Sequence, residues 1–484
     1  MQKKIIMVAI VAALALPAVA MADSAIDLVN VLIKKGVLTQ EEGELLMKGH
    51  TVENEVAAEK EAKAEAKVVA EKKKGDEVIT SFKDGISWET ADKAFKMSLN
   101  GRVQADYRQF QSPQTTKPNT FDIRRAYFGA KGKFYDHVEF EALTDFAKGA
   151  ATGGTNMNVM IEYFLNLDYW EQAQLKLGQF KMPMGMEELG SSRFINFQER
   201  SLAMNLVPAF DRGLQLHGVP AKGITYALAV SNGNLSNSYL QNTTEAAGNA
   251  ANHDGKDVTG RITVNLADQM DNMKDAVIHV GGAFSRGSQD GNGATLSYGT
   301  EAKGATFFTS KALTAGTRVE VDRNALELGL ASGPVKFTSE WVREGLTVGS
   351  GSAVAAGDRD LTSWYAAVNW NITGESYAPT YKKGKFGERL KPNQNFTGPG
   401  SGLGAWEVGM RYSKFDAGDF VGQTTVSATD VRAMTLGLKW ILNPHTRFLL
   451  NYVKTDFRNT TGGDVVIAGG TSEKAVTFRG QVDF

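Results

Sequence analysis

From Phe95 to the end of the chain, apolar and polar residues alternate with a period of two in one segment after another. In FKMSLNGRVQADY, residues 95–107, the side chains Phe, Met and Leu occupy one face, while Lys, Ser and Asn occupy the other. The same alternation returns in residues 323–330, 406–412, 434–440 and 476–484. Because successive side chains of a β-strand point to opposite faces, this pattern predicts many strands, each with one apolar and one polar face.

Three features of these strands favour a membrane barrel over a soluble sandwich. Charged residues sit in the middle of the polar faces, as expected around a water-filled lumen. Aromatic residues gather near strand ends, as in Tyr169-Trp170 and Trp364-Tyr365, and short turns alternate with long connections. A closed barrel also satisfies every backbone polar group inside a bilayer. We therefore predict an all-β fold, a transmembrane antiparallel β-barrel of about 16 strands over residues 95–484.

The N-terminus has the organisation of a secretory signal peptide. Two lysines precede an apolar run that is too short to span a bilayer as a helix, and small residues follow up to Ala22. We expect residues 1–22 to be removed and the remaining chain to leave the cytoplasm. Together with the barrel pattern, this predicts the outer membrane of a Gram-negative cell.

Two helical segments are expected between the signal peptide and the barrel. Residues 23–50 predict a helical hairpin, in which Gly36 ends the first helix and a capping box from Thr39 to Glu42 begins the second. Residues 51–94 predict a charged helical linker rich in Ala, Glu and Lys. Two interpretations stay open for this linker: a coiled coil that helps the protein to oligomerise, or a single solvated helix, because its apolar positions are mostly alanine.

The composition argues against several other classes of function. Cysteine is absent, and the 6 histidines are scattered without a metal-binding or catalytic spacing. The formal net charge is −1, so no overall positive field attracts nucleic acid. We expect no cofactor, no metal ion, no nucleic-acid partner and no enzymatic activity.

Connection lengths indicate which loops share an end of the barrel. If the N-terminal segment is periplasmic, the connection 111–120 is extracellular and the sides then alternate. Long connections at 183–211, 232–257, 287–322 and 345–360 then fall outside the cell. The connection 374–403 falls on the periplasmic side although it is long, and it contains a cluster of lysines.

Several motifs, taken together and in order, resemble the phosphate-selective porins O and P. They are LNGRVQADY (99–107), FDIRRAYFGAKGKF (121–134), LGQFKMPMGMEE (177–188), FQERS (197–201), NITGE (371–375), GAWEVGMRYS (404–413), LGLKWILNP (436–444) and the final Phe484. The resemblance implies a homotrimeric channel in contact with outer-membrane lipid, which favours small anions such as phosphate. It further implies that inward-folded loops narrow the pore, including a long periplasmic turn near NITGE.

The strands supply the first group of candidate residues for an anion path. A passive pore selects ions through its width and its lining charge, and Arg and Lys are the side chains that bind phosphate oxygens. Strand parity puts the following on the lumen face: Arg102, Arg261, Arg411, Lys439 and Arg479. The resemblance implies lumen arginines at Arg102 and Arg125. Each strand arginine can instead pair with a lumen acid and brace the wall.

The loops supply the second group. The loop 183–211 resembles the constriction loop of the family, and its basic candidates are Lys181, Arg193, Arg200 and Arg212. Arg200 and Arg212 each follow an acidic residue, so pinning of the loop is an equally good interpretation. The segment 382–391 adds Lys382, Lys383, Lys385, Arg389 and Lys391 against one acid, Glu388. A solvated basic turn is the alternative for this cluster.

One departure from the family pattern bears on the solute. The phosphate-specific members carry an arginine-rich segment in the loop that corresponds to 287–322, whereas this loop has Lys303, Lys311 and Arg318 without an arginine cluster. A general or weakly cation-favouring porin therefore stays open beside the anion channel. An outer-membrane enzyme and an envelope-tethering protein are the alternatives from other classes.

Overall fold

The computed structural model describes residues 28–45, 47–48, 59–60, 62–63, 77–82, 85–111, 118–147, 159–233, 255–273, 275–291, 293, 295–460 and 471–484. The chain divides into two compact units, which are described separately: Met1–Val78 with Thr90–Asp92, and Ile79–Glu89 with Lys93–Phe484. The expected signal peptide and most of the expected linker lie outside the described residues.

The N-terminal unit contains the helical hairpin that the sequence predicts. Residues 28–34 and 40–45 are helical, and Gly36 between them has φ +64°, a conformation that glycine adopts without strain. The Thr39 amide donates to the Glu42 carboxylate at 2.9 Å, and the Glu42 amide donates to Thr39 Oγ1 at 3.3 Å, which is the expected capping box. Among the described residues, no helix combines the length and apolar character needed to cross a bilayer.

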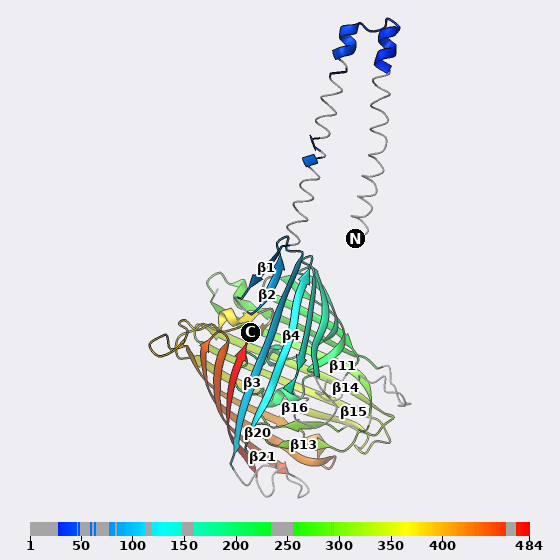
Figure 1. The fold of residues 1–484 in the computed structure, drawn as a ribbon. Coiled ribbons are helices and arrows are strands. Elements are labelled where there is room, and N and C mark those ends of the chain that lie inside the picture. The colour runs from blue at the N-terminus through cyan, green and yellow to red at the C-terminus, as the bar shows by residue number, and fades with distance from the viewer. Residues whose placement is uncertain are drawn as a thin grey trace. The chain divides into compact units, whose positions relative to one another are not determined.

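The second unit is a closed antiparallel barrel (Figure 1). Each strand pairs with the next, and β22 returns to pair with β3, for example Val482 with Val103. The described part of the barrel has sixteen strands: β3 (Phe95–Phe110), β4 (Thr120–Phe134), β5 (Val138–Asp145), β6 (Val159–Trp170), β7 (Ala173–Lys181), β8 (Phe210–Ala221), β9 (Ile224–Ser231), β10 (Asp257–Asn265), β11 (Ala276–Gly291), β14 (Thr317–Ser332), β15 (Val335–Val348), β16 (Gly357–Asn371), β19 (Ala405–Asp416), β20 (Thr424–Asn443), β21 (Thr446–Thr460) and β22 (Ser472–Asp483). The predicted barrel and its strand number are confirmed.

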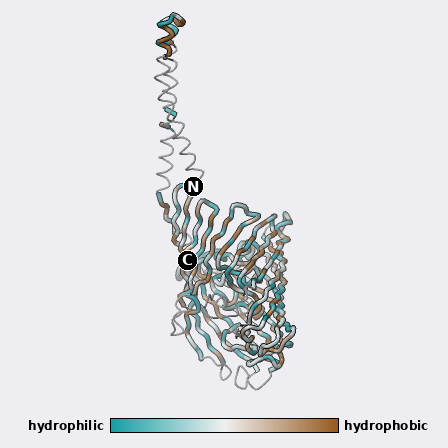
Figure 2. The backbone as a smooth tube through the Cα atoms, turned by 90° about the vertical axis from the view of Figure 1, so that its right-hand side faces the viewer, coloured by the Kyte–Doolittle hydropathy of each residue, from teal (hydrophilic) through white to brown (hydrophobic). Residues whose placement is uncertain are grey.

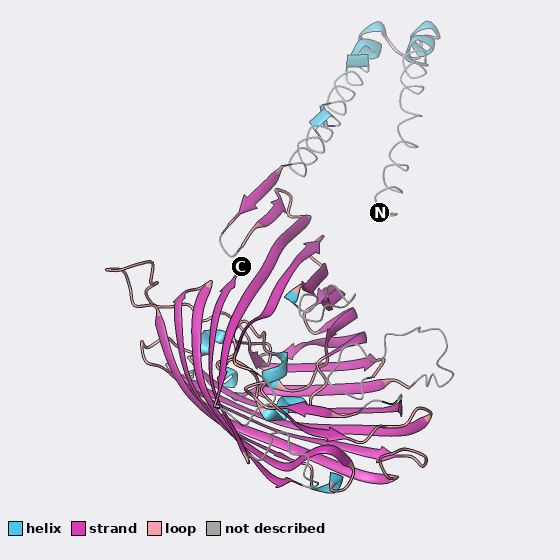
Figure 3. Cartoon of the chain, turned by 60° about the horizontal axis from the view of Figure 1, so that its bottom comes forward, coloured by secondary structure: helices cyan, strands magenta, loops and turns pink. Residues whose placement is uncertain are grey.

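The remaining elements are short (Figure 3). They are β1 (Val78–Ser81), β2 (Ser87–Thr90), α5 (Met186–Leu189), η1 (Leu202–Asn205), η2 (Leu266–Gln269), β12 (Ser297–Gly299), β13 (Thr306–Ser310), η3 (Ala378–Thr380), β17 (Tyr381–Lys382), β18 (Lys385–Phe386) and η4 (Gly418–Phe420). Two of them, β1 and β2, fall within the range where we expected a helical linker. Their β-branched residues favour strand, and β2 pairs with the first residues of β3, Ser87 with Ser98.

Short turns connect the strands at one end of the barrel, and most long connections lie at the other end. The short turns join β4 to β5, β6 to β7, β8 to β9, β14 to β15 and β20 to β21, as the sequence predicts. The connection 372–404 between β16 and β19 belongs to the short-turn end although it is long. Loop counting therefore correctly placed this connection at the same end of the barrel as the short turns.

The alternation of hydropathy continues along the strands (Figure 2), but its direction reverses within some of them. Along β14, Leu326 points outward and is 62% exposed, whereas Glu327 is buried in the interior. Nearer the long loops the same strand turns the apolar Val319 and Val321 inward and exposes charged residues outward. This half of the interior is therefore apolar, where we expected polar lumen faces throughout.

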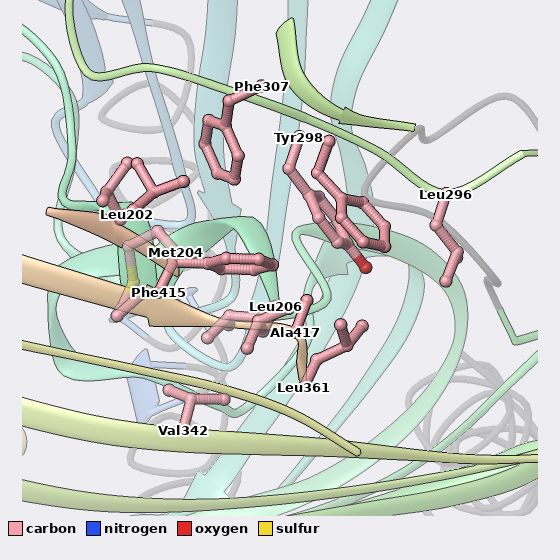
Figure 4. Packing of buried hydrophobic residues seen from close by; sticks show 14 of the residues in the cluster. Leu202, Met204, Leu206, Leu296, Tyr298, Phe307, Val342, Leu361, Phe415 and Ala417 are labelled. Carbon is pink, nitrogen blue, oxygen red and sulfur yellow. The ribbon is translucent and has the colours of Figure 1, made fainter. Parts of the chain in front are cut away.

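Residues from the long connections fill this apolar part of the interior. The inward side chains of β14 to β21 pack there against residues of the loops 182–209 and 292–316. Figure 4 shows Val342, Leu361 and Phe415 from the strands beside Leu202 and Phe307 from these loops. The strand β13 of the connection 292–316 also pairs with the first residues of β20. The lumen is thus divided into a packed apolar part and a polar part.

Candidate channel constriction

The polar part of the lumen contains a cavity of about 750 Å³. Besides Lys303 of the connection 292–316, its lining comes from strands β3 to β10 and from two inward-folded segments. We call these the constriction loop, residues 182–209, and the lysine loop, residues 372–404. Because the packed core occupies the side of β14 to β21, the cavity lies against the opposite part of the wall.

A buried carboxylate anchors the start of the constriction loop. Glu340 of β15 accepts hydrogen bonds from the amides of Met186 and Glu187 at 2.6 and 2.7 Å. The Tyr365 hydroxyl donates a third bond to Glu340 at 2.8 Å. These amides belong to the first turn of α5, where backbone N–H groups lack partners within the helix. The loop is therefore fixed inside the barrel at this point.

An ion-pair network anchors the other half of the constriction loop. Arg124 donates two bonds to Glu199, at 2.9 and 3.2 Å, and Arg479 donates one at 2.8 Å. Burial raises the pKa of Glu199, but the guanidinium groups of Arg124, Arg125 and Arg479 outweigh it and hold the pKa well below its usual range. Arg479 also forms a bidentate pair with Asp106 of β3. The loop is thereby held to β3, β4 and β22.

A second carboxylate, Glu301, anchors the connection 292–316. It accepts bonds from Arg411 at 2.6 and 3.2 Å, from the Ser413 and Thr435 hydroxyls at 2.6 Å, and from the Leu202 amide at 3.3 Å. Arg411 is 1% exposed and lies in this buried cluster, so it does not line the cavity.

The lysine loop enters the lumen as a tight hairpin of β17 and β18. Its two turn residues have positive φ, +47° at Lys383 and +76° at Gly384. The Gly384 carbonyl accepts a bond of 2.6 Å from Arg261, and the Tyr381 hydroxyl lies 2.8 Å from Nδ1 of His279. A Cβ at Gly384 would lie 2.6 Å from Thr263 Oγ1. The hairpin is thus packed closely on the barrel wall and carries its lysines into the cavity.

Most of the residues predicted from the sequence reach the cavity. Those that line it are Arg102, Arg125, Lys181, Arg193, Arg200, Arg261, Lys382, Lys383 and Lys385. Among the others, Arg212 donates to Gln179 at 3.1 Å, Arg389 pairs with Asp483 at 2.5 Å and Lys391 is exposed. Lys439, also assigned to the lumen face, pairs with Glu407.

Several further residues line the cavity that the sequence reasoning did not assign to the anion path. The additional basic residues are Arg124, Lys131, Lys176 and Lys303, and the acids are Glu139, Glu141, Glu162, Glu188, Glu199 and Glu388. Lys176 could have been predicted, because the alternation AQLKLGQ places it on the polar face of β7. No local pattern indicates that Lys303 lies in the cavity, because its long loop folds back through contacts with distant strands.

The lining cations differ in whether a carboxylate neutralises them. Arg261 forms a bidentate pair with Glu327, and Arg200 pairs with Glu188 at 3.1 Å. Among the described residues, seven lining cations have no carboxylate at ion-pair distance: Arg102, Lys131, Lys176, Arg193, Lys382, Lys383 and Lys385. The lining acids that lack such a cation are Glu141, Glu162 and Glu388. The cavity therefore has an excess of unneutralised positive charge.

Burial also lowers the pKa of two lysines in the inward-folded loops. Desolvation lowers the pKa of Lys385 to about 8, and Lys176 and Arg261 act in the same direction. Lys303, on the connection 292–316, is half-buried, and desolvation lowers its pKa to about 8. These two ammonium groups therefore change their charge just above neutral pH.

Comparison with known proteins assigns the chain to a family. The family described as "Phosphate-selective porin O and P" matches residues 97–484. Porin O of Pseudomonas aeruginosa is 26% identical over 419 residues, which cover 81% of this chain and 90% of that protein.

Solved structures of porins are among those similar to this chain. The anion-selective porin from Comamonas acidovorans is 12% identical, with a TM-score of 0.49 over 81% of this chain and 100% of that chain. The outer membrane channel DcaP of Acinetobacter baumannii is 10% identical, with a TM-score of 0.46 over 81% of this chain and 98% of that chain. The family match extends over nearly the whole barrel and most of the chain, so the protein belongs to the phosphate-selective porins O and P, a family of outer-membrane channels.

Proposed function

We propose that this outer-membrane porin conducts small anions passively through the cavity between β3–β10 and its two inward loops. The observation that carries the proposal is the excess of lining cations without a carboxylate partner. Such cations attract anions into a narrow polar path and leave their guanidinium and ammonium donors available to the solute. The lysine loop and the constriction loop act together, because Lys385 donates to the Leu189 carbonyl at 3.2 Å.

The proposed transport unit is a broad anion pore rather than a high-affinity phosphate channel. Of the three basic residues of the connection 292–316 and its flanks, Lys303 lines the cavity, while Arg318 pairs with Glu320 on the exposed outer face. The connection 292–316 itself therefore brings no arginine cluster to the cavity. We therefore expect phosphate to permeate as one of several small anions.

The orientation and assembly are further parts of the proposal. We propose that the short-turn end faces the periplasm, so the N-terminal segment and the lysine loop are periplasmic. We also propose a homotrimer, as the family resemblance implies. Labelling of single cysteines placed in the turn 222–223 and in the loop 349–356 on intact cells tests the orientation, and mass measurement in detergent tests the trimer.

Measurement of ion selectivity in planar bilayers tests the function. The purified full-length protein should give channels whose reversal potential in a KCl gradient shows preference for chloride, and phosphate should cause weak block. A preference for potassium would contradict the anion pore and favour the general or cation-favouring porin.

A tethering role for the N-terminal segment is tested separately. Deletion of residues 24–90 should leave conductance unchanged if that segment serves tethering or assembly. Loss of envelope integrity in cells that carry this deletion would support tethering.

A further inference from the structure

Two strand carboxylates that line the cavity have no cation at ion-pair distance among the described residues, although the cavity is rich in cations. Glu141 of β5 and Glu162 of β6 are half-buried and line the cavity. Within the described ranges, neither side chain forms a hydrogen bond or an ion pair with the protein. An uncompensated carboxylate is costly to keep in a partly desolvated site, so these two favour a cationic group from outside.

A donor-rich group of side chains lines the same cavity. Arg102 and Asn100 of β3 line the cavity, and their side chains are 5% and 4% exposed. Among the described residues, Nε of Arg102 and Nδ2 of Asn100 have no hydrogen-bond acceptor. Arg193 of the constriction loop joins them, since its Nη2 donates to Asn100 Oδ1 at 3.0 Å. These donors lack an acceptor, and a carboxylate or phosphate oxygen supplies one.

The two groups are close enough to act on a single solute. Arg193 interacts electrostatically with both Glu141 and Glu162, so the donors and the carboxylates face the same volume. Aromatic rings also line this volume, including Tyr127, beneath the Arg102 guanidinium at 4.0 Å, and Phe164, beneath the Lys176 ammonium at 4.4 Å. The cavity, at about 750 Å³, is large enough for a small organic molecule.

We propose that this cavity is bipolar and preferentially admits small zwitterionic solutes, whose anionic end meets Asn100, Arg102 and Arg193 and whose ammonium end meets Glu141 and Glu162. The proposal rests on the anion pore proposed above. It adds that, among organic solutes, this pore favours zwitterions. An anion without an ammonium group meets the same donors but is repelled by the two carboxylates. A cation without an anionic group is repelled by the unneutralised Arg and Lys residues.

Solute flux into proteoliposomes tests the inference with three probes of similar size: γ-aminobutyrate, butyrate and butylammonium. With wild-type protein, γ-aminobutyrate should enter about two- to fivefold faster than butyrate, the range expected if each half-exposed charge contact contributes about 0.5–1 kcal/mol. Butylammonium should be the slowest. The double variant E141Q/E162Q should lose the advantage of γ-aminobutyrate and admit butyrate faster than the wild type does.

The controls separate this inference from the anion pore. E171Q changes an exposed glutamate in the turn between β6 and β7, outside the cavity, and should behave as the wild type. R193Q should slow γ-aminobutyrate and butyrate alike. If wild-type liposomes take up butyrate as fast as γ-aminobutyrate while chloride selectivity persists, the bipolar cavity is overturned and the anion pore stands. If butylammonium is fastest and potassium is preferred, both proposals fail.

Discussion

Glu340 of the barrel wall holds the constriction loop through the backbone amide of Met186, which lies 2.6 Å from its Oε2 atom. The neighbouring amide of Glu187 donates to the other carboxylate oxygen, so one side chain satisfies two amides of a helix start. The start of the constriction loop is thus held by a buried carboxylate that lies more than 150 residues away in the sequence.

Substitution of this carboxylate should widen the pore. E340A leaves the two amides of α5 without an acceptor, at a cost of about 1–3 kcal/mol for each buried group. The loop should then leave its position, so single-channel conductance should rise and chloride selectivity should fall. E320Q, which removes an exposed glutamate paired with Arg318, is the matched control and should change neither quantity. An unchanged conductance in E340A, with an intact barrel by circular dichroism, would show that the loop has other sufficient anchors.

The Arg411–Glu301 pair should matter mainly for stability. Removal of Glu301 leaves a buried arginine with a weaker partner and leaves two hydroxyls and an amide without their acceptor. We expect E301A to lower the free energy of unfolding by about 3–5 kcal/mol, the range for breaking a buried ion pair. Heat-induced unfolding on gels measures this loss. R343Q, which removes a half-exposed arginine that pairs with Asp322 and Asp360, should cost less than E301A does.

Gly384 should be intolerant of a side chain. Its φ of +76° favours glycine, and an added Cβ would lie 2.6 Å from Thr263 Oγ1 and 2.7 Å from Thr225 Oγ1. G384A should therefore displace the lysine hairpin from the cavity and reduce chloride selectivity without unfolding the barrel. G374A is the control, because Gly374 in the same loop also has a positive φ, +90°, but an added Cβ would meet no neighbouring atom. It therefore shows the effect of backbone strain without displacement of the hairpin. Equal selectivity in the two variants would contradict the packing of the hairpin.

Anion preference should weaken as the pH rises through about 8. Burial lowers the pKa of Lys385 and of Lys303 to about 8, so both are charged below this pH and neutral above it. The reversal potential in a KCl gradient should therefore shift towards the cation side between about pH 6.5 and about pH 9.5. The double variant K303R/K385R, with guanidinium groups that stay charged, should remove most of this shift. If the shift persists unchanged in that variant, groups other than Lys303 and Lys385 cause it.

Much of the barrel was predictable from the sequence, because the alternation of apolar and polar residues within each strand shows which side chains share a face. The hairpin capping box at Thr39 and Glu42, the strand number and the end of the barrel that carries the lysine loop all follow from local patterns and loop counting. Those patterns depend on residues that are close to one another in the sequence, so they can be recognised in a single sequence.

The interior was less predictable for a physical reason. The polarity of strands such as β14 reverses near the long loops, where Val319 and Val321 face a packed core. The sequence shows this reversal, because charged residues occupy the face that is apolar in the rest of the strand. It could not be interpreted from the sequence, because the apolar interior forms only where the long loops fold back into the barrel. Arg411 shows the same limit: parity placed it on the lumen side, while its partner Glu301 comes from a loop 110 residues away.

The anion pore itself is tested most directly by one comparison of reversal potentials. Wild-type protein and the variant K382Q/K383Q/K385Q are measured in the same KCl gradient, with K391Q as the control for an exposed lysine of the same loop outside the cavity. We predict chloride preference in the wild type and in K391Q, and a clear reduction in the triple variant. Potassium preference in the wild type, or an unchanged reversal potential in the triple variant, would contradict the account.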